Sequence, residues 1–414
     1  MAPTRILDIP DYKILFIGRV FATMSLQAQA VIVGWYVYEL THDPLMLGLI
    51  GLAEAVPAIG FAFLAGHTVD TLKPAQVYRT SVLVLTLNAL VILAISLPAL
   101  PISSVTRLLV LFSAVFVSGM MRSFTSPSVF SLIAHIVPRH LMVVASAWNS
   151  WAFQMAAISG PAIGGLIYGA IGSTWAFAFP PLLMSAAWLT LPFFSHSTVH
   201  MQSQSVREPF LVSIHKGIRF ALGQRVLISA MTLDMLSVLF GGAVAILPMF
   251  SDQILHAGSM GLGILRAAPA VGSAAVALVM TRRPMRTISG KMLLFCVAGF
   301  GLSNIGFAYS SSFSLAFFFL VLSGAFDGVS MVIRNTILQL LTPQEMRGRI
   351  SSLSLIFVTS SNEIGAFESG LAARALGLIP SLIFGGSVTL VVVAMTAWLS
   401  PDLAKTRIQP GHPT

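Results

Sequence analysis

Charged side chains are scarce in this chain. Asp, Glu, Lys and Arg make up only 9% of its 414 residues, against roughly 25% in an ordinary soluble domain. Hydrophobic residues make up 56%, and no soluble fold of this length needs so much apolar surface. The composition therefore excludes a soluble globular protein and indicates one that lies in a lipid bilayer.

Several chemistries are also missing. The single cysteine, Cys296, can form no intramolecular disulfide, and the nine histidines lack the spacing that binds a metal ion. The sequence has no G-x-x-x-x-G-K-S/T motif for ATP and no nucleophile paired with a base. We therefore expect no enzyme activity, no metal and no cofactor. Energy for any work must come from an ion gradient or from the gradient of the substrate itself.

Long apolar segments are abundant instead. Twelve windows are long enough for a helix to cross the ~30 Å hydrocarbon core of a bilayer. Lipid offers the backbone no hydrogen bonds, so each window should be a helix. The windows span 13–39, 45–67, 76–98, 104–124, 143–169, 174–195, 226–250, 257–280, 290–309, 313–334, 345–372 and 379–399.

The basic residues are distributed unevenly between the loops. If the N-terminus is cytoplasmic, seventeen Lys and Arg residues fall in cytoplasmic segments and only Arg107 and Arg374 fall outside. This bias follows the positive-inside rule and predicts that both termini are cytoplasmic. The net charge of +9 thus orients the chain and indicates no nucleic-acid partner. The polar start "MAPTRILDIPDYK" is not typical of a cleaved signal peptide.

The two halves of the sequence resemble each other. The segment 196–225 separates six windows in 1–195 from six in 226–414, and we expect it to be a cytoplasmic connecting loop. A shift of 205 residues aligns 119–172 with 324–377 and matches Gly119, Gly165 and Gly172 with Gly324, Gly370 and Gly377. A shift of 212 aligns "EAVPAIG" (54–60) with "RAAPAVG" (266–272). The registers predict two parallel six-helix repeats.

These segments also carry a family resemblance. "GLGILRAAPAVG", "GAFDGVSMVIRNT" and "TPQEMRGRISSLSLIFVTSSNEIGAFESG" resemble the major facilitator superfamily of transporters, in the bacterial branch that includes the enterobactin exporter. The resemblance implies an all-α polytopic membrane protein with twelve transmembrane helices in two pseudo-symmetric six-helix halves. It also implies a monomer in the bacterial cytoplasmic membrane, with a small-molecule substrate between the halves and protons as a further partner.

One superfamily motif departs from the usual pattern. The loop after the second span usually reads G-x-x-x-D-R-x-G-R-R, and here it reads "GHTVDTLKPA". Asp70 remains, but the arginines have gone. Asp70 either caps the loop or latches the cytoplasmic side with Arg347 or Arg349, whose main role would otherwise be to bind lipid phosphate.

The span 143–169 contains "GPAIGG", which resembles the core of a motif typical of antiporters in the superfamily. Gly160, Gly164 and Gly165 let another helix approach closely, and Pro161 removes a backbone hydrogen bond. Ordinary packing of small residues explains the segment equally well. The resemblance favours export.

Ionisable residues inside membrane spans are functional candidates by default. The two registers pair opposite charges, because Glu54 corresponds to Arg266 and Arg122 to Asp327. In the resembled fold Asp234, Arg122 and Asp327 would line the central cavity, whereas Glu54, Arg266 and Glu363 would lie between the halves. A purely structural ion-pair network is the alternative. The full set is Arg19, Glu54, Arg122, Asp234, Arg266, Asp327, Arg334, Glu363 and Glu368.

Partners for these charges follow in part from spacing. Arg334 stands seven residues after Asp327, about 20° away around a helix and ~10.5 Å along it. Asp327 can therefore pair with Arg334 through water, or with Arg122 across the cavity. Glu363 and Glu368 are five residues apart, so they point about 140° apart and cannot serve one site. We expect one of them to face the opposite half, near Glu54.

The sequence as a whole predicts a proton-coupled secondary exporter of a small amphipathic organic molecule that works by alternating access. The segment "FATMSLQAQAVIVGWY" offers Gln27 and Trp35 to a bulky, partly apolar ligand. A metabolite importer or uniporter, a lysolipid flippase, and a membrane sensor or scaffold that binds without turnover are the alternatives.

Overall fold

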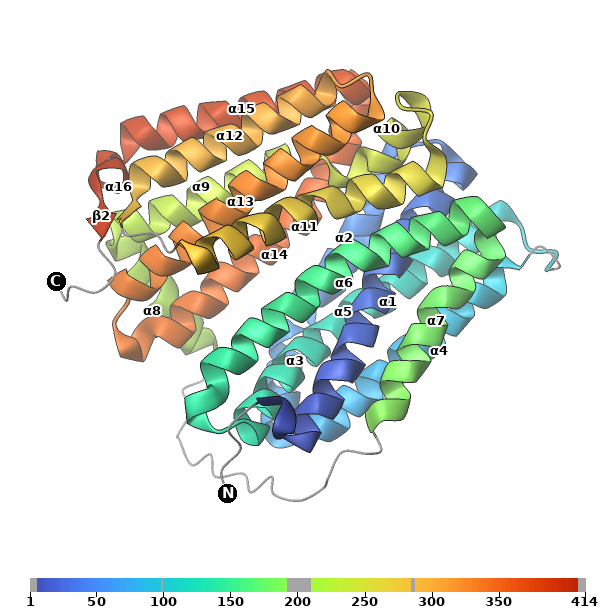
Figure 1. Ribbon diagram of the computed structural model, residues 1–414, viewed down its shortest axis with the longest axis horizontal. Coiled ribbons are helices and arrows are strands. Elements are labelled where there is room, and N and C mark those ends of the chain that lie inside the picture. Colours follow the sequence, from blue (N-terminus) through green and yellow to red (C-terminus); the bar gives the residue numbers. More distant parts are fainter. Residues whose placement is uncertain (1–5, 98–99, 192–209, 284–286, 409–414) are drawn as a thin grey trace. The chain divides into compact units, whose positions relative to one another are not determined.

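The computed structural model describes residues 6–97, 100–191, 210–283 and 287–408, and these residues are almost entirely helical (Figure 1). Each of the twelve apolar windows coincides with one helix or with two or three consecutive helices. The described residues also contain two strands of two residues each, β1 (Ile288–Ser289) and β2 (Arg407–Ile408). They pair antiparallel and align Ile288 with Ile408. The all-α architecture follows from the hydropathy of the sequence.

The helices of the first half of the chain are η1 (Ile6–Asp8), α1 (Pro10–Thr41), α2 (Pro44–Gly60), α3 (Ala62–Thr71), α4 (Pro74–Ser96), α5 (Ser104–Ile136), η2 (Arg139–Leu141), α6 (Met142–Ile171) and α7 (Ser173–Thr190). Those of the second half are α8 (Phe210–Gly223), α9 (Arg225–Gly241), η4 (Val244–Ile246), α10 (Leu247–Gln253), α11 (Gly258–Arg282), α12 (Gly290–Ala308), α13 (Phe313–Leu341), α14 (Gln344–Leu376), α15 (Leu378–Leu399) and α16 (Pro401–Lys405).

By length and hydropathy alone, nine helical segments of the described chain qualify as membrane spans. The other three expected spans have physical reasons to fall short. The second is divided into α2 and α3 at Phe61, α7 contains Pro180 and Pro181, and α14 contains Glu363 and Glu368 within an otherwise apolar stretch. Polar or broken spans of this kind occur in transporters, where they face protein or water and not lipid.

Helix ends follow local sequence signals. Pro10 and Pro74 start α1 and α4, where a missing backbone N–H costs nothing. The hydroxyl of Ser103 accepts from the N–H of Thr106 at the start of α5. Gly172 and Gly377 end α6 and α14 with the same φ of 93°, a left-handed value that favours glycine. These two glycines are equivalent under the shift of 205 residues, so the repeat extends to backbone conformation.

The described residues form two compact units. The first unit comprises Met1–His42, Leu52–Ser205 and Ala257–Ala267, and the second comprises Asp43–Gly51, Val206–His256 and Ala268–Thr414. The start of α2 therefore packs with the second unit, and the start of α11 packs with the first. The predicted division into 1–195, a loop of 196–225 and 226–414 stays a prediction, and residues 196–209 lie outside the described part of the chain.

Glycines allow these two helix starts to pack closely. In the first unit, a Cβ on Gly165 would lie 2.5 Å from the carbonyl oxygen of Ser259 and 2.8 Å from Gly263 Cα. In the second unit, a Cβ on Gly370 would lie 2.6 Å from the carbonyl oxygen of Pro44. Gly165 and Gly370 are equivalent in the repeat, so α6 with α11 and α14 with α2 are the same crossing made twice.

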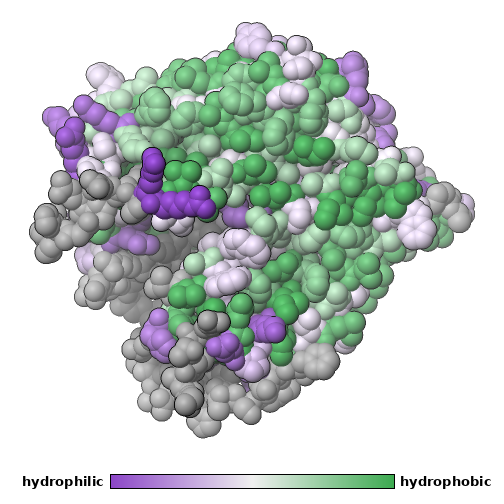
Figure 2. All heavy atoms as spheres, in the orientation of Figure 1, coloured by the Kyte–Doolittle hydropathy of each residue, from purple (hydrophilic) through white to green (hydrophobic). Residues whose placement is uncertain are grey.

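Each unit has an apolar core of its own. Leu85, Leu132 and Met184 pack together in the first unit, and Leu293, Ile333 and Ile337 do so in the second. Large apolar side chains also cover the outside, where Trp398 is 80% exposed. On the face in Figure 2 hydrophobic residues cover most of the described surface. An apolar exterior around a partly polar interior is typical of a membrane protein.

Candidate functional site

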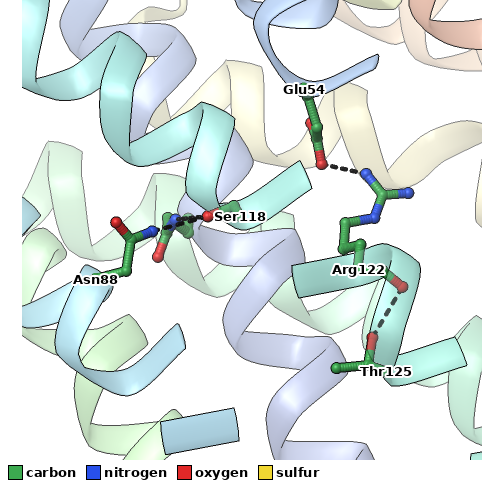
Figure 3. A network of polar contacts seen from close by, with 6 residues as sticks. Glu54, Asn88, Ser118, Arg122 and Thr125 are labelled. Atoms are coloured by element: carbon green, nitrogen blue, oxygen red, sulfur yellow. Dashed lines mark hydrogen bonds and ion pairs between the residues drawn. The ribbon is translucent and has the colours of Figure 1, made fainter. Parts of the chain in front are cut away.

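An ion pair joins α2 to α5 in the first unit. Arg122 Nη1 donates to Glu54 Oε1, and both side chains are partly exposed (Figure 3). The two helices touch at this point, since a Cβ on Gly119 would collide with the backbone of Glu54. Glu54 and Arg122 were both predicted site residues, but their pairing with each other was not. The expectation that Arg122 reaches Asp327 stays a prediction.

A buried amide on α4 contacts α5. Asn88 Nδ2 donates to Ser118 Oγ and to the carbonyl oxygen of Ala114, each at 2.9 Å, and Gln29 Nε2 lies 3.4 Å from Ser118 Oγ (Figure 3). The second unit repeats the arrangement, where Ser323 Oγ donates to Asn304 Oδ1 at 3.5 Å. Ser118 and Ser323 are equivalent under the shift of 205. This repeated Asn–Ser contact is therefore part of the fold and not of a single site.

The second unit contains a buried ion pair. Arg334 on α13 forms an ion pair through Nη1 with Oδ1 of Asp234 on α9, and the two residues are only 5% and 6% exposed. Leu233 and Ile333, which precede the two partners in the chain, belong to the apolar core of this unit. Removing two charges from water is costly even when they pair, so a buried ion pair is weak support for a purely stabilising role.

The positions equivalent to this ion pair in the first unit carry apolar residues. The shift of 212 residues aligns Asp234 with Ala22, and the shift of 205 aligns Arg334 with Val129. Ala22 and Val129 are buried and belong to one apolar cluster. The fold therefore packs well at this position without any charge, and the ion pair is a property of the second unit alone.

Asp327 and two serines extend this site along α13 and α9. Asp327 is partly buried on α13, and among the described residues it has no direct hydrogen-bond or ion-pair partner. Its expected contact with Arg334 through water stays a prediction. The hydroxyls of Ser237 and Ser330 and the Nε of Arg334 are buried, again without a hydrogen-bond partner in the described chain. Buried donors of this kind usually bind water or a ligand.

A second carboxylate site, which sequence reasoning missed, lies at the end of α1. Trp35 Nε1 donates to Glu39 Oε1 at 2.6 Å, and the Tyr168 hydroxyl donates to Glu39 Oε2. The rings of Trp35 and Tyr168 meet edge to face at 6.4 Å. Glu39 is the last residue of the first apolar window, and that position was the available signal. Trp35 was predicted to contact substrate, and its indole N–H is used here.

Among the remaining predicted residues, Gln27, Gly160 and Gly164 lie on the contact between α1 and α6. A Cβ on Gly160 would lie 2.9 Å from Gln27 Cβ, and one on Gly164 would lie 3.3 Å from Ala28. Gly165 faces α11 instead, and Pro161 lies inside α6, where its carbonyl oxygen approaches Gly263. Arg19 is partly buried and close to the hydroxyls of Tyr12 and Tyr78.

The interface residues are less completely described. Arg266, Glu363 and Glu368 are partly buried, and Glu363 lies beside Gly51 in the second unit. Glu368 has no hydrogen-bond or ion-pair partner among the described residues. The predictions for Asp70, Arg347 and Arg349 concern side chains that lie outside the described ones.

Two six-helix repeats with charged groups inside their spans define a secondary transporter of the major facilitator fold. The transmembrane secretion effector family of this superfamily matches residues 1–408, and the chain belongs to that family. The predicted fold and transporter class are thus confirmed.

Characterised relatives match along almost the whole chain. The enterobactin exporter EntS of Shigella flexneri is 24% identical over 407 residues, which cover 98% of this chain and 95% of that protein. EntS of Escherichia coli O1:K1 is 23% identical over 406 residues, with the same coverage. The predicted likeness to this efflux branch is confirmed, and it places the chain among multi-pass membrane transporters and not among enzymes.

Solved structures agree on the fold. A POT family transporter in complex with a thioalcohol-conjugated peptide superposes with a TM-score of 0.75 at 13% identity, covering 95% of this chain and 96% of that one. A bacterial homologue of the iron transporter ferroportin, in an inward-facing state, superposes with a TM-score of 0.72 at 16% identity, covering 97% and 100%. At these identities the likeness concerns architecture alone.

Proposed function

We propose that this protein is a proton-coupled exporter of a small amphipathic organic molecule in a bacterial cytoplasmic membrane. The observation that carries the proposal is the buried Asp234–Arg334 pair. An ionisable pair inside a membrane unit, at a place where the equivalent unit is apolar, is a candidate for ion coupling. The "GPAIGG" segment and the exporter relatives support the outward direction.

Enterobactin is the first substrate to test, because the named relatives export it. A proton gradient is the natural energy source, since the sequence has no ATP-binding motif. Glu54 and Arg122 are assigned to the movement of α2 against α5, where their pair is partly exposed and free to break. Gln27, Trp35 and Arg19 on α1 are assigned to the substrate pathway.

The test uses everted membrane vesicles, whose interior corresponds to the outside of the cell. Vesicles with the unchanged protein should accumulate enterobactin, or another amphipathic compound of a screening panel, when the interior is acidified. Asp234→Asn should abolish this accumulation while counterflow exchange continues. Asp402→Asn is the matched control, because Asp402 is an exposed aspartate of the same unit.

Other outcomes separate the alternatives. Counterflow without accumulation would replace the exporter with a uniporter or importer. Movement of a lysolipid, but of no panel compound, would indicate a flippase. No exchange of any compound would overturn transport itself in favour of a sensor or scaffold. Accumulation that is equally strong in Asp234→Asn would remove the buried pair from proton coupling.

A further inference from the structure

A stripe of polar residues runs along one face of α13. Ser323, Asp327, Ser330 and Arg334 follow one another at spacings of four, three and four residues, so they share a face of the helix. Ser330 lies ~4.5 Å along the axis from Asp327 and ~6 Å from Arg334. A helical side chain leans toward the N-terminus of its helix. The side chain of Arg334 therefore leans toward Ser330 and Asp327.

Ser237 lies on the same side of the ion pair as Ser330. The helices α9 and α13 belong to the seventh and tenth of the twelve spans, so an odd number of crossings separates them and they cross the membrane in opposite directions. Ser237 follows Asp234 by three residues on α9, whereas Ser330 precedes Arg334 by four on α13. Both unpartnered hydroxyls thus lie one turn beyond the ion pair, toward Asp327. The Nε of Arg334 also has no hydrogen-bond partner among the described residues, so three buried donors accompany the two carboxylates.

The charges of this cluster do not balance. It contains two carboxylates, Asp234 and Asp327, and one guanidinium, Arg334. Arg334 holds Asp234, which leaves Asp327 without a partner among the described residues. A single uncompensated charge inside a membrane protein is costly, and the carboxylate removes the cost by taking a proton.

We propose that Arg334 is shared by two carboxylates of the second unit, Asp234 and Asp327, and that the cluster binds one proton on whichever carboxylate Arg334 does not hold. In the structure Arg334 holds Asp234, and the proton resides on Asp327. In the alternative state the O–H bond at Asp327 breaks, and the proton passes by way of Ser330 and bound water to an oxygen of Asp234. The guanidinium keeps its charge throughout and turns its N–H groups from Asp234 to Asp327.

The two states differ in which helices the ion pair of Arg334 connects. The Asp234–Arg334 pair connects α9 to α13, whereas an Asp327–Arg334 pair would lie entirely within α13. Movement of the proton therefore makes or breaks the only ion pair that joins these two helices in the described part of the unit. This gives proton exchange a direct effect on helix packing, and its use in transport rests on the proposed function.

The neighbouring helices supply few competing charges. The helices packed against α13 in this unit are α9, α11, α12 and α14. On α11, Arg282 is exposed and Arg266 has interactions of its own. Arg225 stands at the start of α9, nine residues before Asp234, and Lys291 is exposed at the start of α12. On α14, Glu363 has interactions of its own, Glu368 is partly buried, and Arg374 pairs with Asp43 at 3.3 Å. Glu368 is thus the rival proton carrier.

The first experiment is infrared spectroscopy of the purified protein at neutral pH, with isotope-labelled aspartate to identify the C=O stretch of a protonated aspartic acid. The unchanged protein should show one such group. Asp327→Asn should remove it, and so should Asp234→Asn, because Arg334 then ionises Asp327. Arg334→Met should double the band, and Glu368→Gln should leave it unchanged. A band that survives Asp327→Asn, or that does not grow in Arg334→Met, overturns the proposal.

The second experiment remains decisive if Arg334→Met does not fold. Asp234→Asn and Asp327→Asn should each lower the melting temperature modestly, because Arg334 keeps one carboxylate. The double variant should lose far more than the sum of the two, because Arg334 then has none. Ser323→Ala is the control on the same face. Additive losses overturn the shared arginine. Neither experiment needs a substrate, so both outcomes are independent of whether the protein exports anything.

Discussion

Replacing Arg334 with valine should destabilise the second unit strongly. In this variant Asp234, which is only 6% exposed, loses its ion-pair partner. Breaking a buried pair by removing one member typically costs about 3–5 kcal/mol. For a unit of this size, each kcal/mol lowers the melting temperature by roughly 2–4 °C, so we expect a loss of roughly 6–20 °C. Adding Asp234→Ala should recover most of it, because Ala22 and Val129 fill the equivalent places in the first unit.

The single cysteine provides the assay. Cys296 is 3% exposed on α12, so a fluorogenic thiol reagent reacts with it only when the second unit unfolds. Melting curves of the unchanged protein, Arg334→Val and the double variant can be compared in one detergent. A double variant no more stable than Arg334→Val would refute the argument, since it would mean that this position needs the charges for folding.

Three further predictions follow from other parts of the structure. In the first unit, Glu54→Arg and Arg122→Glu should each impair transport, and the double variant should recover part of the activity. A double variant as inactive as the single variants would mean that this ion pair is not the essential contact. Gly165→Val should prevent the close approach of α6 and α11 and lower the melting temperature, whereas Gly60→Ala, where a Cβ meets no atom within 4 Å, should not. Reporter fusions after Lys73 should report cytoplasm and those after Ile102 periplasm, and the reverse result would invert the predicted topology.

The architecture could be predicted from the sequence because lipid enforces it. Twelve apolar windows and two registers were sufficient to identify the helices and the repeat. The break between α2 and α3 at Phe61 was not predicted, although Pro57 and Gly60 precede it and both residue types favour the interruption of a helix. The close crossings at Gly165 and Gly370 were signalled only by small residues, which ordinary packing would explain equally well.

The charged residues were predictable as candidates, but their partners were not. Arg334 is 100 residues from Asp234 in the chain, and spacing along one helix favoured Asp327 instead. Which carboxylate an arginine reaches depends on how α9 packs against α13, and neither hydropathy nor periodicity contains that information. Glu39 was missed for a related reason, because its partner Tyr168 is 129 residues away. The repeat was the one long-range signal, and it identified the place where the two units differ.

In the proposed mechanism the Asp234–Arg334–Asp327 cluster couples one proton to transport. Its most direct test is the internal pH of proteoliposomes, recorded while they exchange the compound found in the vesicle screen. The unchanged protein should move protons in a fixed ratio to the compound. Asp234→Asn and Asp327→Asn should exchange the compound with no change in internal pH. Variants that move as many protons per molecule as the unchanged protein would contradict the account.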